Sequence, residues 1–502
     1  MYDCRNVIVQ IPQPASAAHS PAETPLASTG LVSRSGQVKR SVRGGEVSVL
    51  SSQVAHRLCS LDIMGSISKS TGDIYRPTPA DITINNHQPG DPEKVLFKNV
   101  RILDSTGSLP YLGAVLIQGE RIVAVGQVDE TASTGALVID GGGSKMLMSG
   151  LVDAHTHLSF NNAKTLDGLT TMPLEEHVIA TAHSAKTYLD CGYTMCFGAA
   201  SARARLDIAI KASIKSGLIP GPRTLANTPE ITTTGGAIVP DISKYADGPH
   251  EMRKTVRSFI ELGADNIKLS ITGDNITDSM PSDETYFTLE ETVAAVEEAH
   301  NRGKRVCAHA RSKESVKLCL QAGVDVIYHA SFNDEESLKM LEKRKDSVFV
   351  APAINLPLAT CAGDAIPFGF TVEMAEQKGV KEEVEAACKS MREMHRRGIR
   401  VLPGGDYGFA WAPHGTYARD LYHFVKHFGY TPMESILAAT ALGGEIMGYP
   451  EELGKVQPGY YADVILVDGD PLADITVLQD TSRLHAIVIN GHIHKNVSGP
   501  AY

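Results

Sequence analysis

The middle of the chain alternates short apolar runs with helical patterns, and this alternation restricts the fold more than any other feature. The runs RVCAHA and VDVIYHA, for example, each follow a helical pattern that ends in glycine. About eight such units fit into residues 148–452, which predicts an α/β fold with a (β/α)8, TIM-like barrel. A doubly wound sheet is the alternative, but no G-x-G-x-x-G fingerprint follows the first strand.

Two β-rich segments flank this predicted barrel. Residues 95–147 contain the runs VLFKNVRIL and GAVLIQGERIVAVG, which are bounded by Gly, Asp and Ser. Residues 453–496 contain YADVILVDGD and LHAIVINGHIHK, which have the same character. Because chain ends often lie near each other, we expect both segments to form one small β-sandwich.

The first 90 residues differ in composition from the rest of the chain. Residues 1–90 are rich in Ser, Pro, Gly and Thr and show little periodicity, which predicts a mostly disordered segment. This segment has no apolar core like that of a secretory signal, so we expect a cytoplasmic protein. Its few acids and several arginines leave a mitochondrial transit peptide as an alternative, and Met64 is an alternative start.

Composition narrows the class of partner and the compartment. A net charge of −11 argues against nucleic-acid binding, and no segment approaches the ~18–20 apolar residues of a membrane span. The eight cysteines are scattered without a C-x-x-C pair, which favours buried free thiols over a disulfide framework. We therefore expect a small-molecule substrate and, as the general default, a closed homo-oligomer.

Polar residues recur where the apolar runs of the predicted barrel stop. Barrel enzymes carry their chemistry at the carboxyl ends of their strands. The candidates at these ends are His155, His157, His309, His329 and Asp406. Residues i and i+2 of a strand point the same way, so His155 and His157 can share one ion. A lone H-x-H motif is weak evidence for a metal site, but four imidazoles and a carboxylate at strand ends are stronger evidence together. Imidazole and carboxylate ligands favour Zn, Mn, Fe or Co over Ca.

Lys268 is unusual because it lies inside the apolar run NIKLS. Burying an ammonium group costs free energy, which favours the neutral amine. A neutral amine can react with carbon dioxide to form a carbamate, an anionic ligand able to bridge two cations. The alternative is a lysine whose head reaches solvent, but the neighbouring candidates favour the carbamate.

Several motifs together carry a family resemblance over residues 95–496. These motifs are SGLVDAHTHL, GADNIKLSITG, RVCAHARS, GVDVIYHASFNDEE, GGDYG with PHGTYARDL, and GKVQPGYYADVILVDGDPLADI. The chain resembles the metal-dependent amidohydrolase superfamily. Within it, the chain is most similar to the imidazolonepropionase-like and prolidase-like branch, which includes fungal ochratoxin-hydrolysing amidases.

The resemblance implies a site with two divalent ions, with Zn favoured. It assigns His155, His157 and Asp406 to the more buried ion, His309 and His329 to the second, and Lys268, as a carbamate, to both. A hydroxide that bridges the metals would attack an amide carbonyl, and Asp406 would carry its proton to the leaving nitrogen. The implied reaction is hydrolysis of an N-acyl amino acid, a dipeptide or a related small metabolite.

Further residues are candidates for substrate contact. Tyr328 adjoins a ligand and could donate to an oxyanion, which would make it catalytic beside His329 and Asp406; its alternative role is core packing. Tyr407 and His414 follow the last strand, where barrel enzymes bind substrate. Arg311 could pair with a substrate carboxylate, although a solvated loop arginine is the stronger expectation.

Three positions depart from the common family pattern. Phe197-Gly198 stands where relatives often carry Arg-Asp, Tyr328 where they often carry Glu, and Gly235-Gly236-Ala237 where they often carry Gly-Gly-His. None of these is a candidate ligand, so they bear on substrate identity. Two alternatives stay open: a deaminase or cyclic-amide or cyclic-imine hydrolase of the same superfamily, which typically uses one metal, and a non-catalytic scaffold on the same fold.

Overall fold

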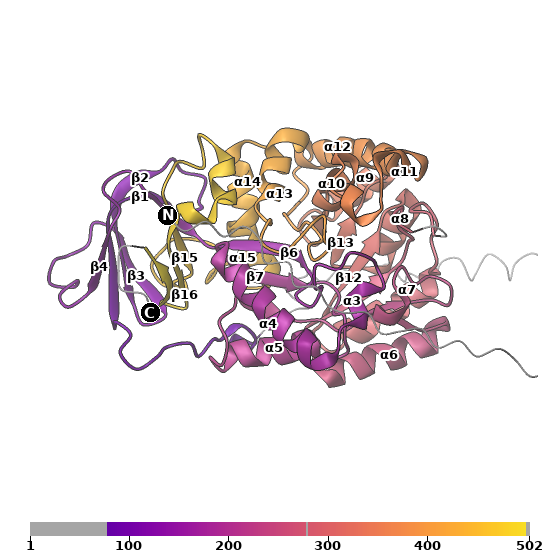
Figure 1. The fold of residues 1–502 in the computed structure, drawn as a ribbon, viewed down its shortest axis with the longest axis horizontal. Coiled ribbons are helices and arrows are strands. Elements are labelled where there is room, and N and C mark those ends of the chain that lie inside the picture. The colour runs from indigo at the N-terminus through magenta and orange to yellow at the C-terminus, as the bar shows by residue number, and fades with distance from the viewer. Residues whose placement is uncertain (1–77, 278–279, 498–502) are drawn as a thin grey trace, which may run out of the picture. The chain divides into compact units, whose positions relative to one another are not determined.

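The computed structural model describes residues 78–277 and 280–497 (Figure 1). Most of the segment expected to be disordered, residues 1–77, lies outside the described residues. Residues 78–90, however, pack on the fold: helix α2 (Pro79–Ile82) begins just inside this range, and Ile82 and Ile84 are buried. The backbone of Ile84 also accepts a hydrogen bond from Asn490 Nδ2 at 2.7 Å. Residues 78–90 therefore contribute to the folded part of the chain, because these apolar side chains find a core.

Strands from both flanks of the barrel region combine in one eight-stranded sheet (Figure 1). Its order is β17-β16-β15-β5-β1-β2-β3, with β4 paired to β1. The strands are β1 (Lys94–Leu103), β2 (Tyr111–Gln118), β3 (Arg121–Gly126), β4 (Leu137–Asp140), β5 (Met146–Ser149), β15 (Val464–Val467), β16 (Leu484–Ile489) and β17 (His492–Asn496). The antiparallel pair β5–β15 joins the two flanks. Strand pairing thus gives one composite sheet, and its division into a two-layered sandwich stays a prediction.

A shift in strand register keeps the composite sheet apolar on one side. In β1, Val95 and Phe97 are buried in the regular alternation of a strand. The register then shifts between Phe97 and Val100, where Asn99 adopts a positive φ of 48°. This bulge lets Val100 and Ile102 face the same apolar cluster as Val95 and Phe97.

The middle of the chain forms two parallel sheets with helices between the strands. One sheet has the order β6-β7-β8, and the other has the order β10-β9-β11-β12-β13-β14. The strands are β6 (Leu151–Thr156), β7 (Tyr193–Gly198), β8 (Arg223–Leu225), β9 (Glu230–Thr232), β10 (Ser243–Tyr245), β11 (Asn266–Ser270), β12 (Arg305–Ala310), β13 (Val326–His329) and β14 (Phe349–Ala351).

Helices separate most of these strands along the chain. The α-helices are α3 (Gly168–Thr171), α4 (Leu174–Asp190), α5 (Leu206–Lys215), α6 (Gly248–Leu262), α7 (Leu289–His300), α8 (Lys313–Ala322), α9 (Glu335–Lys343), α10 (Asn355–Ala362), α11 (Val372–Gln377), α12 (Val380–Arg396), α13 (Arg419–His423), α14 (Pro432–Ala439) and α15 (Ala441–Met447). Shorter helical turns are η2 (Pro240–Ile242), η3 (Ile366–Phe368), η4 (Phe424–Phe428), η5 (Ile475–Gln479) and η6 (Thr481–Arg483).

Backbone hydrogen bonds connect the two parallel sheets. The Asp265 amide, just before β11, donates to Ala226 O, just after β8, at 2.9 Å. The Ala154 amide of β6 donates at 3.0 Å to Pro403 O, in a segment that is bridged to β14 through Val401 and Val350. The arrangement is TIM-barrel-like, with the composite sheet as an additional domain. For the described residues, strand pairing records two sheets and not one closed barrel, so full (β/α)8 closure stays a prediction.

Two compositional expectations can be compared with the described residues. The cysteines there are all free thiols, and five of the six are buried: Cys191, Cys196, Cys307, Cys319 and Cys388, with Cys361 partly exposed. The prediction of free thiols is therefore confirmed for the described part of the chain. Among the helices of this part, none combines the length and the apolar character that crossing a membrane requires.

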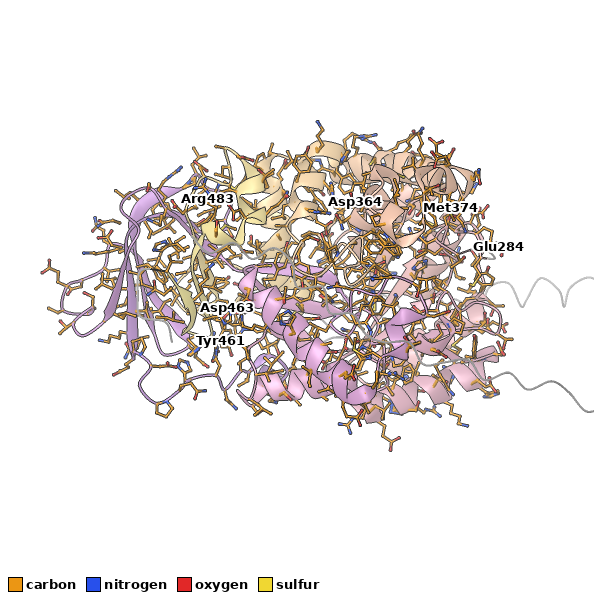
Figure 2. All side chains as sticks on the ribbon, in the orientation of Figure 1. Glu284, Asp364, Met374, Tyr461, Asp463 and Arg483 are labelled. Carbon is orange, nitrogen blue, oxygen red and sulfur yellow. The ribbon has the colours of Figure 1, made fainter. Side chains whose placement is uncertain are left out.

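A buried arginine links the parallel sheets to the composite sheet. Arg223 of β8 donates to Asp463 through Nε at 2.6 Å and through Nη2 at 3.0 Å. Its Nη2 also donates to Asn490 Oδ1 at 2.9 Å, and its guanidinium stacks over the ring of Tyr461. Asp463 and Tyr461 are labelled in Figure 2. This bidentate pair is fully desolvated, so removing one partner leaves a buried charge without compensation.

Replacing Arg223 with Met should lower the free energy of unfolding by about 3–5 kcal/mol, because the Asp463 carboxylate stays buried without its cation. Urea unfolding followed by circular dichroism measures this change. The control is Lys186→Ala, which removes an exposed ion pair with Asp190 and should cost about 0–1 kcal/mol. Equal unfolding curves for the two variants would show that the Arg223 link does not stabilise the fold.

Candidate active site

An irregularity in β6 turns His155 toward the centre of the parallel sheets. Val152 and Ala154 pack in a central apolar cluster, whereas the carboxylate of Asp153 points the other way and accepts a hydrogen bond from the Tyr188 hydroxyl. The register of β6 against β7 then shifts between Asp153 and Thr156. As a result the ring of His155, next to Ala154, also lies on the central side, where it stacks on the ring of Tyr328.

Glycine at position 404 makes this placement possible. A Cβ atom at Gly404 would lie 2.6 Å from the backbone nitrogen of His155. The segment that carries Gly404 leads to Asp406, whose φ of 59° is uncommon for a residue other than glycine. This turn brings the Asp406 carboxylate to the end of β6.

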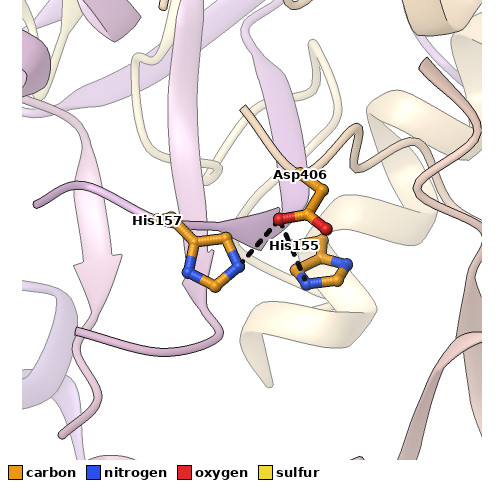
Figure 3. Close-up of side chains that lie close together, drawn as sticks. All are labelled: His155, His157 and Asp406. Atoms are coloured by element: carbon orange, nitrogen blue, oxygen red, sulfur yellow. Dashed lines mark ion pairs between the residues drawn. The ribbon is translucent and has the colours of Figure 1, made fainter. Parts of the chain in front are cut away.

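His155, His157 and Asp406 form a compact group at this end of the strands (Figure 3). Asp406 Oδ1 lies 3.1 Å from His157 Nε2 and 4.0 Å from His155 Nε2. One ligand atom of each residue lies within 4.8 Å of the other two, and all three side chains are buried. The group therefore has the spacing and the donor atoms to hold a metal ion.

Lys268 and His309 reach the same region through regular strand alternation. In β11, Ile267 and Leu269 pack in the cluster formed with the helices, so Lys268 faces the opposite, central side. In β12, Val306 and Ala308 pack outward in the same way, so His309 also faces inward.

His329 does not follow this alternation. Tyr328 already occupies the central cluster, so a regular strand would turn His329 outward. His329 instead adopts a positive φ of 69°, and its ring contacts those of His309 and His155 at centroid distances of 4.2 and 5.2 Å. The backbone conformation thus returns this imidazole to the group of candidate ligands.

These side chains surround one cavity. Five of the six predicted ligands line it: His155, His157, Lys268, His309 and Asp406. The sixth, His329, contacts two of them. The apolar part of the lining consists of Phe160, Leu166, Ile238, Val239, Ile242, Ile276, Leu356 and Phe409. The structure therefore brings the predicted ligands together, although their individual roles as ligands stay a prediction.

Two acidic residues of the cavity were missed from the sequence. Glu230 begins the short strand β9, and Asp274 lies in the loop after β11. Glu230 stands in TPEITTTGG, which shows no strand alternation long enough to indicate an inward side chain. Asp274 follows the motif that contains Lys268, so its place just after a barrel strand was a signal that could have been used.

Burial controls the protonation of the candidate ligands. Burial holds the pKa values of His155, His309 and His329 well below the ordinary histidine value, so these rings stay neutral and their lone pairs are available. Burial by itself would raise the pKa of Asp406, but His155, His157 and Lys268 lower it below the ordinary carboxyl value. Asp406 is therefore an ionised carboxylate near the neutral rings of His155, His309 and His329.

A hydrogen bond orients the ring of His157, and Asp153 binds the backbone amide of His155. The His157 Nδ1 atom lies 2.8 Å from Ala200 O, so Nδ1–H donates there and Nε2 faces Asp406. Asp153 accepts hydrogen bonds from the His155 amide at 2.9 Å and from the Tyr188 hydroxyl at 2.7 Å. Burial raises the pKa of Asp153 to about 6 despite these two donors.

Two predicted substrate contacts lie behind the cavity wall. The His414 Nε2 atom lies 2.6 Å from Phe160 O, and its Nδ1 atom lies 3.0 Å from the Tyr417 hydroxyl. The Tyr407 hydroxyl donates to Tyr417 O at 3.0 Å. Neither His414 nor Tyr407 is among the residues that line the cavity. The polar groups of these side chains are used to support the wall, and both substrate contacts stay predictions.

Arg311 and Tyr328 are both buried in the structure. Arg311 is 3% exposed and forms ion pairs with Asp274 and Glu383, so the expectation of a solvated loop arginine is wrong. The guanidinium of Arg311 is paired with the carboxylates of Asp274 and Glu383. The predicted contact of Arg311 with a substrate carboxylate is therefore unsupported. Tyr328 packs in the central cluster beneath His155, outside the cavity lining, as its core-packing alternative predicts.

Comparisons with known proteins agree with this arrangement. The Amidohydrolase family model matches residues 146–494. The ochratoxinase of Aspergillus niger is 26% identical over 463 residues, covering 84% of this chain and 92% of that protein. Its crystal structure has a TM-score of 0.71 at 23% identity, covering 81% of this chain and 97% of the other. The crystal structure of a prolidase complexed with N-methylphosphonate-L-proline has a TM-score of 0.72 at 25% identity. The match covers 80% of this chain and 100% of the prolidase chain. From its motifs, the geometry of its site and these matches, the chain belongs to the amidohydrolase family, in its prolidase-like branch.

Proposed function

We propose that the protein is a binuclear metal-dependent hydrolase that cleaves the amide bond of an N-acyl amino acid, a dipeptide or a related small metabolite. The gathering of the predicted ligands around one buried cavity carries this proposal. The similarity to an ochratoxinase and to a prolidase supports amide hydrolysis as the reaction.

The side chains present fit a pair of divalent cations. Imidazole and carboxylate donors suit Zn. His155 Nδ1 and both ring nitrogens of His329 are buried without a hydrogen-bond partner. A buried polar atom without a hydrogen-bond partner costs about 1–3 kcal/mol of stability. A nitrogen that binds a cation would no longer carry this cost.

The proposed assignment follows the positions of these donors. His155, His157 and Asp406 would hold one cation, because their donor atoms lie within 4.8 Å of one another. His309 and His329 would hold the second, because their rings are in contact. Lys268, as a carbamate, would contribute to both.

The residues of the cavity account for the remaining chemistry. Divalent cations lower the pKa of a bound water to about 7 and polarise a carbonyl oxygen. Asp406 is ionised and lies at the cavity, so its carboxylate would accept the proton of the attacking water and donate it to the leaving nitrogen. The wall that contains Phe160, Leu356 and Phe409 would bind an apolar part of the substrate and exclude bulk water.

Replacing Asp406 with Asn should abolish turnover while most of the metal stays bound, because the amide keeps an oxygen donor but loses the proton acceptor. Release of the free amine from N-acyl amino acids measures turnover, and elemental analysis measures metal content. Tyr407→Phe is the matched control next in the sequence, since the Tyr407 hydroxyl donates to Tyr417 O and Tyr407 does not line the cavity. Unchanged turnover in Asp406→Asn would refute the assigned role.

The purified protein should contain about two divalent cations per chain and should release a free amine from N-acyl amino acids or dipeptides. Chelation should remove activity, and added Zn should restore it. Elemental analysis together with a substrate panel checks these expectations. One cation per chain with release of ammonia would instead favour a deaminase of the same superfamily.

A further inference from the structure

Glu230 faces Lys268 across the cavity, although no motif of the sequence singles it out. Its Oε2 atom lies 3.7 Å from Lys268 Nζ, and its Oε1 atom accepts a hydrogen bond from Ser243 Oγ at 3.1 Å. Glu230 is 5% exposed and lines the same cavity as the predicted ligands. Glu230 is therefore a buried acid at the centre of the site, and the proposed mechanism does not use it.

The topology of β9 directs Glu230 inward. Ile231 pairs with Leu269 of β11 and packs with it in the cluster shared with the helices. Since neighbouring residues of a strand face opposite sides, Glu230 and Thr232 face the centre. Thr232 Oγ1 donates to Ser270 O at 3.0 Å, which helps to hold β9 against β11. The acid is thus placed by the sheet and not by a free loop.

The charge of Glu230 requires a partner. A buried carboxylate is tolerated when it is paired with a cation, and an uncompensated one costs several kcal/mol. Lys268 is the cationic side chain that faces it in this structure. If Lys268 becomes a carbamate, however, this ion pair becomes two neighbouring anions. A cation bound between the strands would then be needed to compensate both.

The other acids of the cavity differ from Glu230 in this respect. Asp406 lies beside the two histidines of β6. Asp274 is paired with the guanidinium of Arg311. Glu230 alone among these three carboxylates is paired with the residue that is predicted to change its charge when the site is loaded.

We propose that Glu230 is a further ligand of the metal centre, on the side of Lys268. This inference rests on the proposed function, because it requires that the cavity bind divalent cations. It adds a carboxylate from β9 to a donor set that otherwise comes from β6, β11, β12, β13 and the turn at Asp406.

The test compares Zn²⁺ binding by the full-length, metal-depleted protein and three variants, measured by competition with a chromophoric chelator in bicarbonate buffer. Glu230→Gln keeps the shape of the side chain and removes the anionic donor. Asp274→Asn removes an equal charge from the same cavity without removing a proposed ligand. Ser243→Ala removes the Ser243 hydroxyl, which lies 3.1 Å from Glu230 Oε1 and 2.9 Å from Val239 O.

Glu230→Gln should weaken binding of one of the two ions by more than about 100-fold, because loss of an outer partner of a ligand typically costs about 10–100-fold. Ser243→Ala should weaken it by about 10-fold, as expected for such an outer partner. Asp274→Asn should stay within about 10-fold of the unmodified protein. Two ions bound by Glu230→Gln with unchanged affinity would overturn the inference, as would equal losses in Glu230→Gln and Asp274→Asn.

Failure of the proposed function gives a different result, because the unmodified protein would then bind no pair of ions. Thermal unfolding of each variant checks that it is folded. If Glu230→Gln does not fold, Glu230→Asp replaces it, since aspartate keeps the buried charge but withdraws the oxygens by one methylene. Weaker binding of one ion by Glu230→Asp is expected, and unchanged affinity would overturn the inference.

Discussion

Three breaks in regular backbone geometry direct the candidate ligands into one space. The bulge in β6 brings His155 to the same side as Ala154, and positive φ angles at His329 and Asp406 turn these two side chains toward it. Positive φ in a residue other than glycine costs of order 1–3 kcal/mol, so the surrounding packing has to maintain it. Such strain is typical of sites where side-chain direction matters more than local stability.

Charge is distributed unevenly around the cavity. Its acids are Asp406, Glu230 and Asp274, whereas Lys268 is the basic side chain of the described lining. Arg311 lies nearby but is shared between Asp274 and Glu383, so it does not neutralise the other acids. A pair of divalent cations would balance this charge and use one of the two ring nitrogens of His329 that have no hydrogen-bond partner. Buried charge and missing hydrogen bonds thus support the same interpretation.

The motifs around the histidines were sufficient to predict the family and the set of candidate ligands, because each motif is a local string of residues. The hydrogen-bond and ion-pair partners of the other candidate residues were not predicted. His414 and Tyr407 were expected to contact substrate from their place after the last strand, but the structure uses their polar groups in hydrogen bonds to Phe160 and Tyr417. Arg311 was expected in solvent, but a glutamate from α12, far along the chain, pairs with it. Such partners are absent from the local sequence.

From the sequence alone, the inward direction of Lys268 and His309 could be inferred, because strand alternation is a local property with a period of two residues. The same holds for the α/β organisation and for the two β-rich flanks. Only the tertiary structure decided that His329 breaks this alternation and that Glu230 faces Lys268. The physical reason is that backbone strain and the pairing of distant buried charges depend on how the strands pack together, and that packing is a property of the whole fold.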